Sequence, residues 1–140
     1  MFQLTDNYLV AEDHLVQALE AVSGLRKVYR SCDLAEMKER GQVTPAAHVI
    51  YAGDAVPETS QGGLQGNVTQ TWMIVIAVSL RDANKSGPLL ASVIHAMAGL
   101  HCELGNFVRK NAPSRPGFSN GFGYYPLAYQ IKFKTKGARP

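Results

Sequence analysis

The fold is decided by residues 72–79, which read WMIVIAVS. Successive side chains of an extended chain point to opposite faces, so Trp72 and Ile74 share one face while Met73 and Val75 share the other. Apolar residues on both faces are typical of a strand that is covered on both sides. We therefore predict a central strand at this position.

A second alternating segment, residues 129–136, reads YQIKFKTK. Every second side chain of an extended segment points the same way, so this one divides into an apolar face and a polar face. The first face consists of Tyr129, Ile131, Phe133 and Thr135, and the second of Gln130, Lys132, Lys134 and Lys136. The pattern predicts a strand with one face in the core and the other open to water or to a partner.

Two amphipathic segments are expected to form helices that pack on one face of the sheet. The first follows Thr5 or Asp6, whose side-chain oxygen can cap the free backbone N–H groups of a first turn, and runs to about Ser23. Apolar residues recur in it at helical spacing. Gly24 is expected to end this helix, because glycine readily adopts a positive φ.

The second helix is expected from Pro88 to Leu104. Proline suits the first position of a helix, where no N–H donor is needed. An apolar stripe wide enough to cover a sheet follows, formed by Leu89, Leu90, Val93, Ile94, Met97, Leu100 and Leu104. Gly105 is expected to end this helix.

The remaining segments complete an α+β fold, with a mostly antiparallel sheet and the helices packed on one face. We expect a short strand at Lys27–Tyr29, a short helix at Asp33–Arg40 that Gly41 ends, and a strand at Ala46–Ala52 after Pro45. No internal repeat or domain boundary is evident, so residues 1–140 are expected to form a single domain.

Two long segments rich in glycine and proline, Gly53–Gly66 and Asn111–Gly123, lack apolar periodicity and are predicted to be exposed loops. Such loops often form binding surfaces. In the first, Gly62, Gly63 and Gly66 have the look of a phosphate-binding loop, but a strand follows instead of a helix, and the usual Lys-Ser or Lys-Thr pair is missing. We predict a flexible loop, which is a candidate for contacts with partners, and no nucleotide site.

Composition is that of a globular protein. Hydrophobic residues make up 46% of the chain and charged residues 18%, which excludes a disordered or collagen-like protein. The net charge of +3 is too small to indicate nucleic-acid binding by itself.

The cysteines and the hydropathy pattern indicate an intracellular protein. The two cysteines, Cys32 and Cys102, form no CxxC pair, so we expect reduced thiols. No apolar stretch is long enough for a leader or a membrane span.

Candidate catalytic and metal-binding residues do not form a recognisable set. Two of the histidines share the second predicted helix but are six residues apart, whereas two metal ligands on one helix are usually three or four apart. We therefore predict no zinc site, no cofactor and no catalytic residue. A pair between Cys102 and either His14 or His48 stays open. The other histidines are His95 and His101, and the acidic residues without an evident partner are Glu36, Glu39 and Glu103.

Two groups of residues are candidates for contacts with partners. The three lysines of residues 129–136 form a row of positive charge that could meet phosphate or an acidic neighbouring subunit, or remain solvated and discourage aggregation. Arg115, Phe118 and Phe122 lie in the second predicted loop. Aromatic residues beside an arginine can form an interface or stack on bases, and packing of the loop onto its own domain is the alternative.

The order of these elements resembles the tail-terminator and minor tail proteins of long-tailed bacteriophages and related prophage particles. The resemblance extends over nearly the whole chain and is architectural. It rests on the first helix with Leu15 and Leu19, the strand entry PAAHV at residues 45–49, the glycine-rich segment, the strand at residues 72–78, the helix at residues 88–104 and the strand at residues 129–133.

The resemblance implies a structural role in virion assembly, without enzymatic activity or cofactor. Such a protein assembles with copies of itself into a ring, implied to be a hexamer, on the end of the tail tube, where it ends polymerisation and helps to join tail to head. The implied partners are the tail tube protein and a head–tail connector protein, with DNA passing through the ring and no membrane. The implied location is the virion tail, after assembly in the cytoplasm of the bacterial host.

Two other classes of function stay open from the residues alone. The first is a small nucleic-acid-binding module that uses the lysine row together with Arg115, and it predicts salt-sensitive binding. The second is a small enzyme in which folding brings Cys102 or a histidine together with a distant group.

Overall fold

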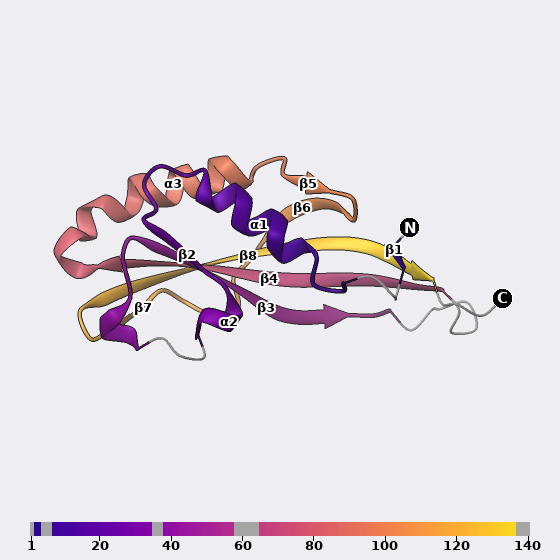
Figure 1. Cartoon of the computed structure of the whole chain (residues 1–140), viewed down its shortest axis with the longest axis horizontal. Coiled ribbons are helices and arrows are strands. Elements are labelled where there is room, and N and C mark those ends of the chain that lie inside the picture. The colour runs from indigo at the N-terminus through magenta and orange to yellow at the C-terminus, as the bar shows by residue number, and fades with distance from the viewer. Residues whose placement is uncertain (1, 4–6, 35–37, 58–64, 137–140) are drawn as a thin grey trace.

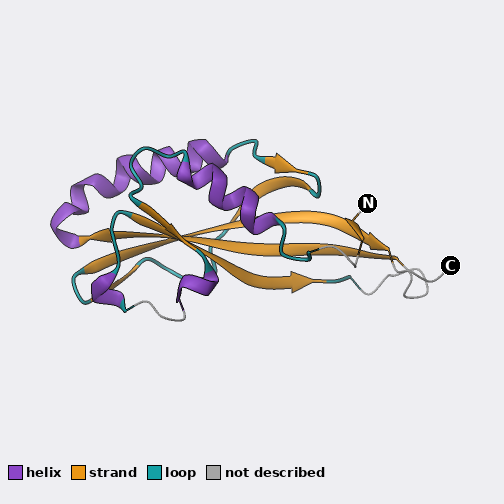
Figure 2. Cartoon of the chain, in the orientation of Figure 1, coloured by secondary structure: helices purple, strands orange, loops and turns teal. Residues whose placement is uncertain are grey.

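The structure is a computed structural model that describes residues 2–3, 7–34, 38–57 and 65–136. It is elongated, and two helices lie over one face of a long twisted sheet (Figure 1). Among the described residues, the opposite face carries short elements and loops, as the colouring by secondary structure makes plain (Figure 2). The prediction of an α+β fold with helices packed on one face is confirmed.

The sheet has the strand order β2-β3-β4-β8-β6-β5, and β1 and β7 also pair with β8. The strands are β1 (Phe2–Gln3), β2 (Lys27–Tyr29), β3 (Ala46–Ala55), β4 (Gln65–Ser79), β5 (His101–Cys102), β6 (Gly105–Lys110), β7 (Gly117–Ser119) and β8 (Phe122–Lys136). Pairing is parallel for β1 with β8 and for β2 with β3, and antiparallel elsewhere.

The centre of the sheet is the antiparallel pair of β4 and β8. Their register runs without interruption from Gln65 opposite Lys136 to Ser79 opposite Phe122. The predicted central strand is therefore confirmed, and β8 begins seven residues earlier than the alternation at residues 129–136 indicated. On the helix-covered face of β4, Trp72, Ile74, Ile76 and Val78 are fully buried.

The first predicted helix is shorter than expected. It is α1 (Ala11–Glu20), and Val10 at its N-cap makes no side-chain capping bond. The Asn7 side chain accepts a hydrogen bond from the backbone N–H of Leu9 in the turn before it, whereas Thr5 and Asp6 lie outside the described residues. Gly24 does not adopt a positive φ, and a Cβ there would come within 2.9 Å of Leu89. The glycine allows two segments to approach closely and does not terminate the helix.

The second predicted helix ends early. It is α3 (Ser86–Met97), after which Ala98 is extended and Gly99 has φ +78°. Leu100 and Leu104 belong to the β5–β6 hairpin and still pack against the core, which is why their helical spacing was misleading. His95 and His101 consequently do not share a helix.

Gly105, predicted to end a helix, instead opens β6. A Cβ there would lie 3.0 Å from the carbonyl oxygen of Lys132, and φ is +152°. Only glycine avoids both the close contact and the backbone strain.

Both predicted loops contain strand. The strand predicted at Ala46–Ala52 is β3, which continues to Ala55 across a register shift after Tyr51, and β4 begins at Gln65. Asn111–Gly123 contains β7 and the start of β8, joined through Asn120 and Gly121, which both have positive φ. An Asn-Gly pair between strands is a strong hairpin signal, and reading the segment only as Gly/Pro-rich missed it.

The remaining helical elements are short. They are α2 (Ser31–Leu34) and the 3-10 helices η1 (Glu39–Gly41) and η2 (Leu80–Lys85). The helix predicted at Asp33–Arg40 is confirmed only at Asp33–Leu34, the end of α2. Glu39 and Arg40 belong to a 3-10 helix, and residues 35–37 lie outside the described residues. The strand predicted at Lys27–Tyr29 is confirmed as β2.

A chain of polar side chains fixes the segment around η1 to the face of the sheet that the long helices leave open. Buried His48 stacks on Tyr29 and lies 3.0 Å from the Gln42 side-chain oxygen. The Gln42 amide donates to the Tyr124 hydroxyl (2.8 Å), which donates to Glu39 (2.6 Å). Each group has a partner, so the polar chain can lie against the sheet without leaving unpaired polar atoms.

Hydrogen bonding and burial shift the pKa values of three groups among these polar side chains. The Tyr124 hydroxyl, followed by Asn120 and Ser119, lowers the pKa of Glu39. Burial, followed by the bond to Glu39, raises the pKa of Tyr124 to about 12. Burial also lowers the pKa of His48. All three shifts favour a charged carboxylate beside neutral hydroxyl and imidazole groups at neutral pH.

We expect Ile76→Ala to lower the free energy of unfolding by about 2–5 kcal/mol, because the fully buried side chain would leave a cavity in the core. Chemical denaturation of the purified variant measures this. Asn67→Ala, at an exposed position of the same strand, is the control and should change the free energy by no more than about 0.5 kcal/mol. Equal effects of the two variants would contradict the burial of this face.

We expect Glu39→Gln to lower the melting temperature at neutral pH and to matter less in acid. The folded-state pKa of this carboxyl is lowered, so its contribution is present above the ordinary carboxyl pKa and is lost as the pH falls through the folded value. Thermal unfolding of both proteins over a pH series tests this, with Glu20→Gln as control. A difference between wild type and Glu39→Gln that does not change with pH would refute it.

Candidate assembly surfaces

The residues predicted for partner contacts fall into two groups at opposite ends of the sheet. Arg115, Phe118 and Phe122, the aromatic end, lie around β7 and the start of β8. Lys132 and Lys134, the basic end, lie ten residues further along β8, which is about 33 Å at the usual rise of a strand. The two groups therefore cannot contribute to one small site.

The aromatic end presents a large exposed apolar side chain on a firmly held hairpin. Phe118 is 66% exposed, and Phe122 is half-buried with its ring centroid 6.5 Å from that of Tyr124. Glu39 accepts hydrogen bonds from Ser119 and Asn120 and so ties the hairpin to the η1 segment. An exposed phenylalanine on such a support is suited to burial against a partner.

The basic end lies on the open face of β8. Lys132 and Lys134 are exposed and stand opposite Thr69 and Asn67 of β4. Among the described residues, no carboxylate lies within ion-pairing distance of either lysine. Their positive charge is therefore available to an external anion.

Four predicted contact residues contribute less. Gly62 and Gly63 lie outside the described residues. Gly66 lies in β4 opposite Thr135, whose hydroxyl donates to the Gly66 carbonyl at 3.5 Å, so it belongs to the sheet and not to a loop. Lys136 pairs with Gln65 at the end of β8, and its side chain lies outside the described residues.

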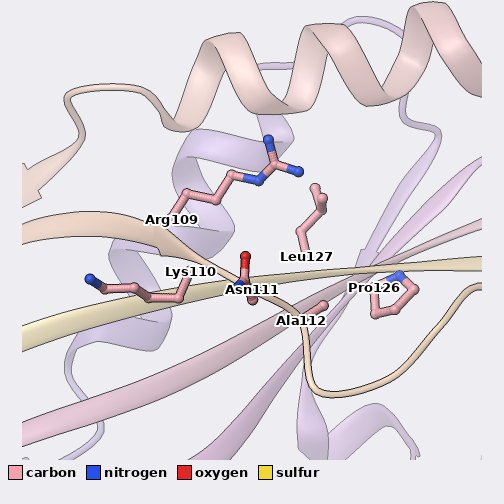
Figure 3. A pocket seen from close by; sticks show the side chains of 6 residues that line it. All are labelled: Arg109, Lys110, Asn111, Ala112, Pro126 and Leu127. Atoms are coloured by element: carbon pink, nitrogen blue, oxygen red, sulfur yellow. The ribbon is translucent and has the colours of Figure 1, made fainter.

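A hollow of about 700 Å³ opens where β6 leaves the sheet, and the sequence analysis missed its charged residues. Arg109 and Leu127 project toward α3, and Lys110 points away from them (Figure 3). Burial raises the pKa of Tyr129, and the positive charge of Arg109 opposes that rise. The hollow is open and cationic, which suits an acidic group of a partner. Residues 105–110 read GNFVRK and do not alternate, so the adjacent β-favouring residues Phe107 and Val108 were the signal for this strand.

Two strands on opposite sides of the sheet have unpaired edges. Beside β3, β2 pairs only with residues 46–48. Among the described residues no other strand pairs along the outer edge of residues 49–55, where the Ser31 hydroxyl donates to the Val49 carbonyl. Beside β6, β5 pairs only with residues 105–106. Free edges of this kind can accept a strand from another chain.

The acidic residues find partners that the sequence did not reveal. Glu39 accepts bonds from the hairpin, and Glu103 lies 3.0 Å from His14. Of the groups considered for Cys102, His14 lies near it: one ligand atom of each is within 4.8 Å of the other, in a cluster that includes Glu103. Glu36 lies outside the described residues.

Comparison with family models matches residues 4–139 to the phage tail terminator protein family. This chain belongs to that family. The expected resemblance is confirmed, and the protein is a structural protein of phage tail assembly. As a family member it is associated with the virion and with other tail or virion components.

Among solved structures, a chain in "Virion of native gene transfer agent (GTA) particle" has the same fold, with a TM-score of 0.58 and 13% sequence identity. The match covers 91% of this chain and 99% of that one. A search of curated proteins found no match. No helix among the described residues is long and apolar enough to cross a membrane.

Proposed function

We propose that this protein closes into a ring of identical subunits, a hexamer as the resemblance implies, on the end of the tail tube. There it ends tube polymerisation and helps join the tail to the head through a connector protein. The observation that carries the proposal is the match of the tail terminator family over residues 4–139. Assembly takes place in the host cytoplasm, before the ring becomes part of the virion tail. The structural character of the family also favours a role without catalysis.

The unpaired edges of β3 and β6 support a head-to-tail assembly. They lie on opposite sides of one sheet, so a contact between them joins two different surfaces. Repetition of such a heterologous contact gives a ring when its rotation closes. Val108 on β6 is half-exposed at 50%, which supplies apolar area beside the edge.

The aromatic end supports a contact with the tube or the connector. Phe118 lies beyond the paired region of β6 with β8, so it is distinct from the two edges. A ring that stops a growing tube needs at least one surface for copies of itself and another for the tube. This division assigns the edges to the ring and the aromatic end to its axial partner.

We expect Phe118→Ser to abolish capping of purified tail tubes while leaving the ring intact. The side chain is exposed, so the free energy of unfolding should change by no more than about 0.5 kcal/mol. Electron microscopy of tube length, with light scattering for subunit count, measures both properties. Val108→Asp should instead prevent ring closure, because it places a charge at the proposed subunit contact.

The control for both variants is Gln17→Ala, at an exposed position of α1, which should cap tubes like wild type. A protein that stays monomeric at every concentration and also leaves tubes uncapped contradicts the proposed ring. Rings that form only on tubes remain consistent with it, so the tube assay decides.

The basic end favours a second role, contact with DNA that passes through the ring. Lys132 and Lys134 are exposed and lack an acidic partner among the described residues, so they can neutralise phosphates and release counterions. A nucleic-acid-binding module acting alone would use the same lysines. Binding to free monomers would favour that alternative over passage through a ring.

We expect the double variant Lys132→Gln/Lys134→Gln to weaken binding to duplex DNA and to reduce the slope of log affinity against log salt by roughly 2. Fluorescence anisotropy over a salt series measures this. Lys38→Gln/Lys85→Gln removes the same charge elsewhere and should leave the slope nearly unchanged. Equal slopes for all three proteins would exclude the basic end from DNA contact.

A further inference from the structure

Three different metal-binding side chains converge beside the sheet, although they are distant in the sequence. They are His14 of α1, Cys102 at the end of β5, and Glu103 in the turn between β5 and β6. One ligand atom from each lies within 4.8 Å of the other two. His14 and Glu103 are already in contact, with 3.0 Å between Nε2 and Oε2.

The fold holds these residues from both sides. The adjacent Leu15 is fully buried, which fixes the face of α1 that carries His14 toward the hairpin. Cys102 pairs with Gly105 across the hairpin and packs against the core, so its position is also constrained. His14 and Cys102 are half-buried and Glu103 is exposed, which leaves the cluster open to solvent on one side.

Mutual proximity distinguishes a metal site from a catalytic triad. In a triad, the nucleophile and the orienting carboxylate use the two different ring nitrogens of the histidine and lie on opposite sides of the ring. Here the thiol sulfur and the carboxylate oxygen are close to each other as well as to the same ring. Three donors around one point are the arrangement that a central cation requires.

We propose that His14, Cys102 and Glu103 bind a divalent transition-metal ion of the zinc class. Imidazole, thiolate and carboxylate together suit Zn²⁺, and three protein ligands with water in the fourth position complete a tetrahedron. Binding requires the thiolate, so the Cys102 thiol releases its proton to solvent as the metal–sulfur bond forms. Imidazole binds in its neutral form, and the ion takes the place of the direct contact between His14 and Glu103.

The bound ion would act as a clamp between α1 and the β5–β6 hairpin. It would connect a helix of the covering layer to the edge of the sheet, where β5 pairs over only two residues. An ion that binds the folded chain and not the unfolded one raises the free energy of unfolding by RT ln(1 + [L]/Kd), where [L] is the concentration of free ion. This inference does not depend on the proposed ring, because the three ligands come from one chain.

Titration of the full chain with Co²⁺ and then Zn²⁺, after chelator treatment, tests the site. Wild type should bind one Co²⁺ with a thiolate-to-cobalt charge-transfer band, lose that band on adding Zn²⁺, and melt at a higher temperature with Zn²⁺ than with chelator. Cys102→Ser should lose the band and bind at least about tenfold more weakly, since even loss of a supporting outer-shell group costs about 10- to 100-fold. Cys32→Ser, at the exposed cysteine of α2, is the matched control and should behave like wild type.

His14→Gln provides an independent test that keeps the thiol. It should weaken Co²⁺ binding at least about tenfold and remove the Zn²⁺-dependent rise in melting temperature, as loss of a ligand must cost no less than loss of an outer-shell partner. Circular dichroism checks that each variant is folded. Absence of a stoichiometric ion in wild type overturns the inference, and so does a cobalt band that survives Cys102→Ser or disappears in Cys32→Ser.

Discussion

The antiparallel pairing of β4 with β8 is the constraint on which the other features of this protein depend. Fifteen residues of each strand are in register, so a change at one point would shift the whole length of the pair. A slip of one residue would exchange the buried and the open faces of both strands. Burial of Trp72 and Ile76 under the helices therefore fixes the face on which Lys132 and Lys134 emerge.

The same pairing explains why candidate contact surfaces of different character coexist in a small domain. The strands are long enough to separate the aromatic end from the basic end, and their neighbours β3 and β6 stay unpaired over much of their outer edges. The proposed ring needs separate surfaces for copies of itself and for other tail components. A small sheet with closed edges would have offered fewer of them.

Prediction from the sequence failed where the same residue pattern fits two different local structures. Leu100 and Leu104 continue the helical spacing of α3, yet they pack from a hairpin, because an apolar residue can reach the same core after the chain has reversed. Gly24 and Gly105 were expected to end helices through positive φ. Both instead allow close approach, to Leu89 and to the backbone of Lys132, and the positive φ of Gly105 lies at the start of a strand. These contacts depend on neighbours that the sequence does not place.

The sequence by itself determined the α+β class, the central strand, the two covering helices and the polar face of β8, because these follow from local periodicity and burial. It also contained enough for the resemblance to tail terminators. Only the tertiary structure decided that Glu39 meets Tyr124 and that His14 meets Cys102 and Glu103. Those pairs join residues far apart in the chain, and their proximity depends on strand order and helix placement, which no local pattern encodes.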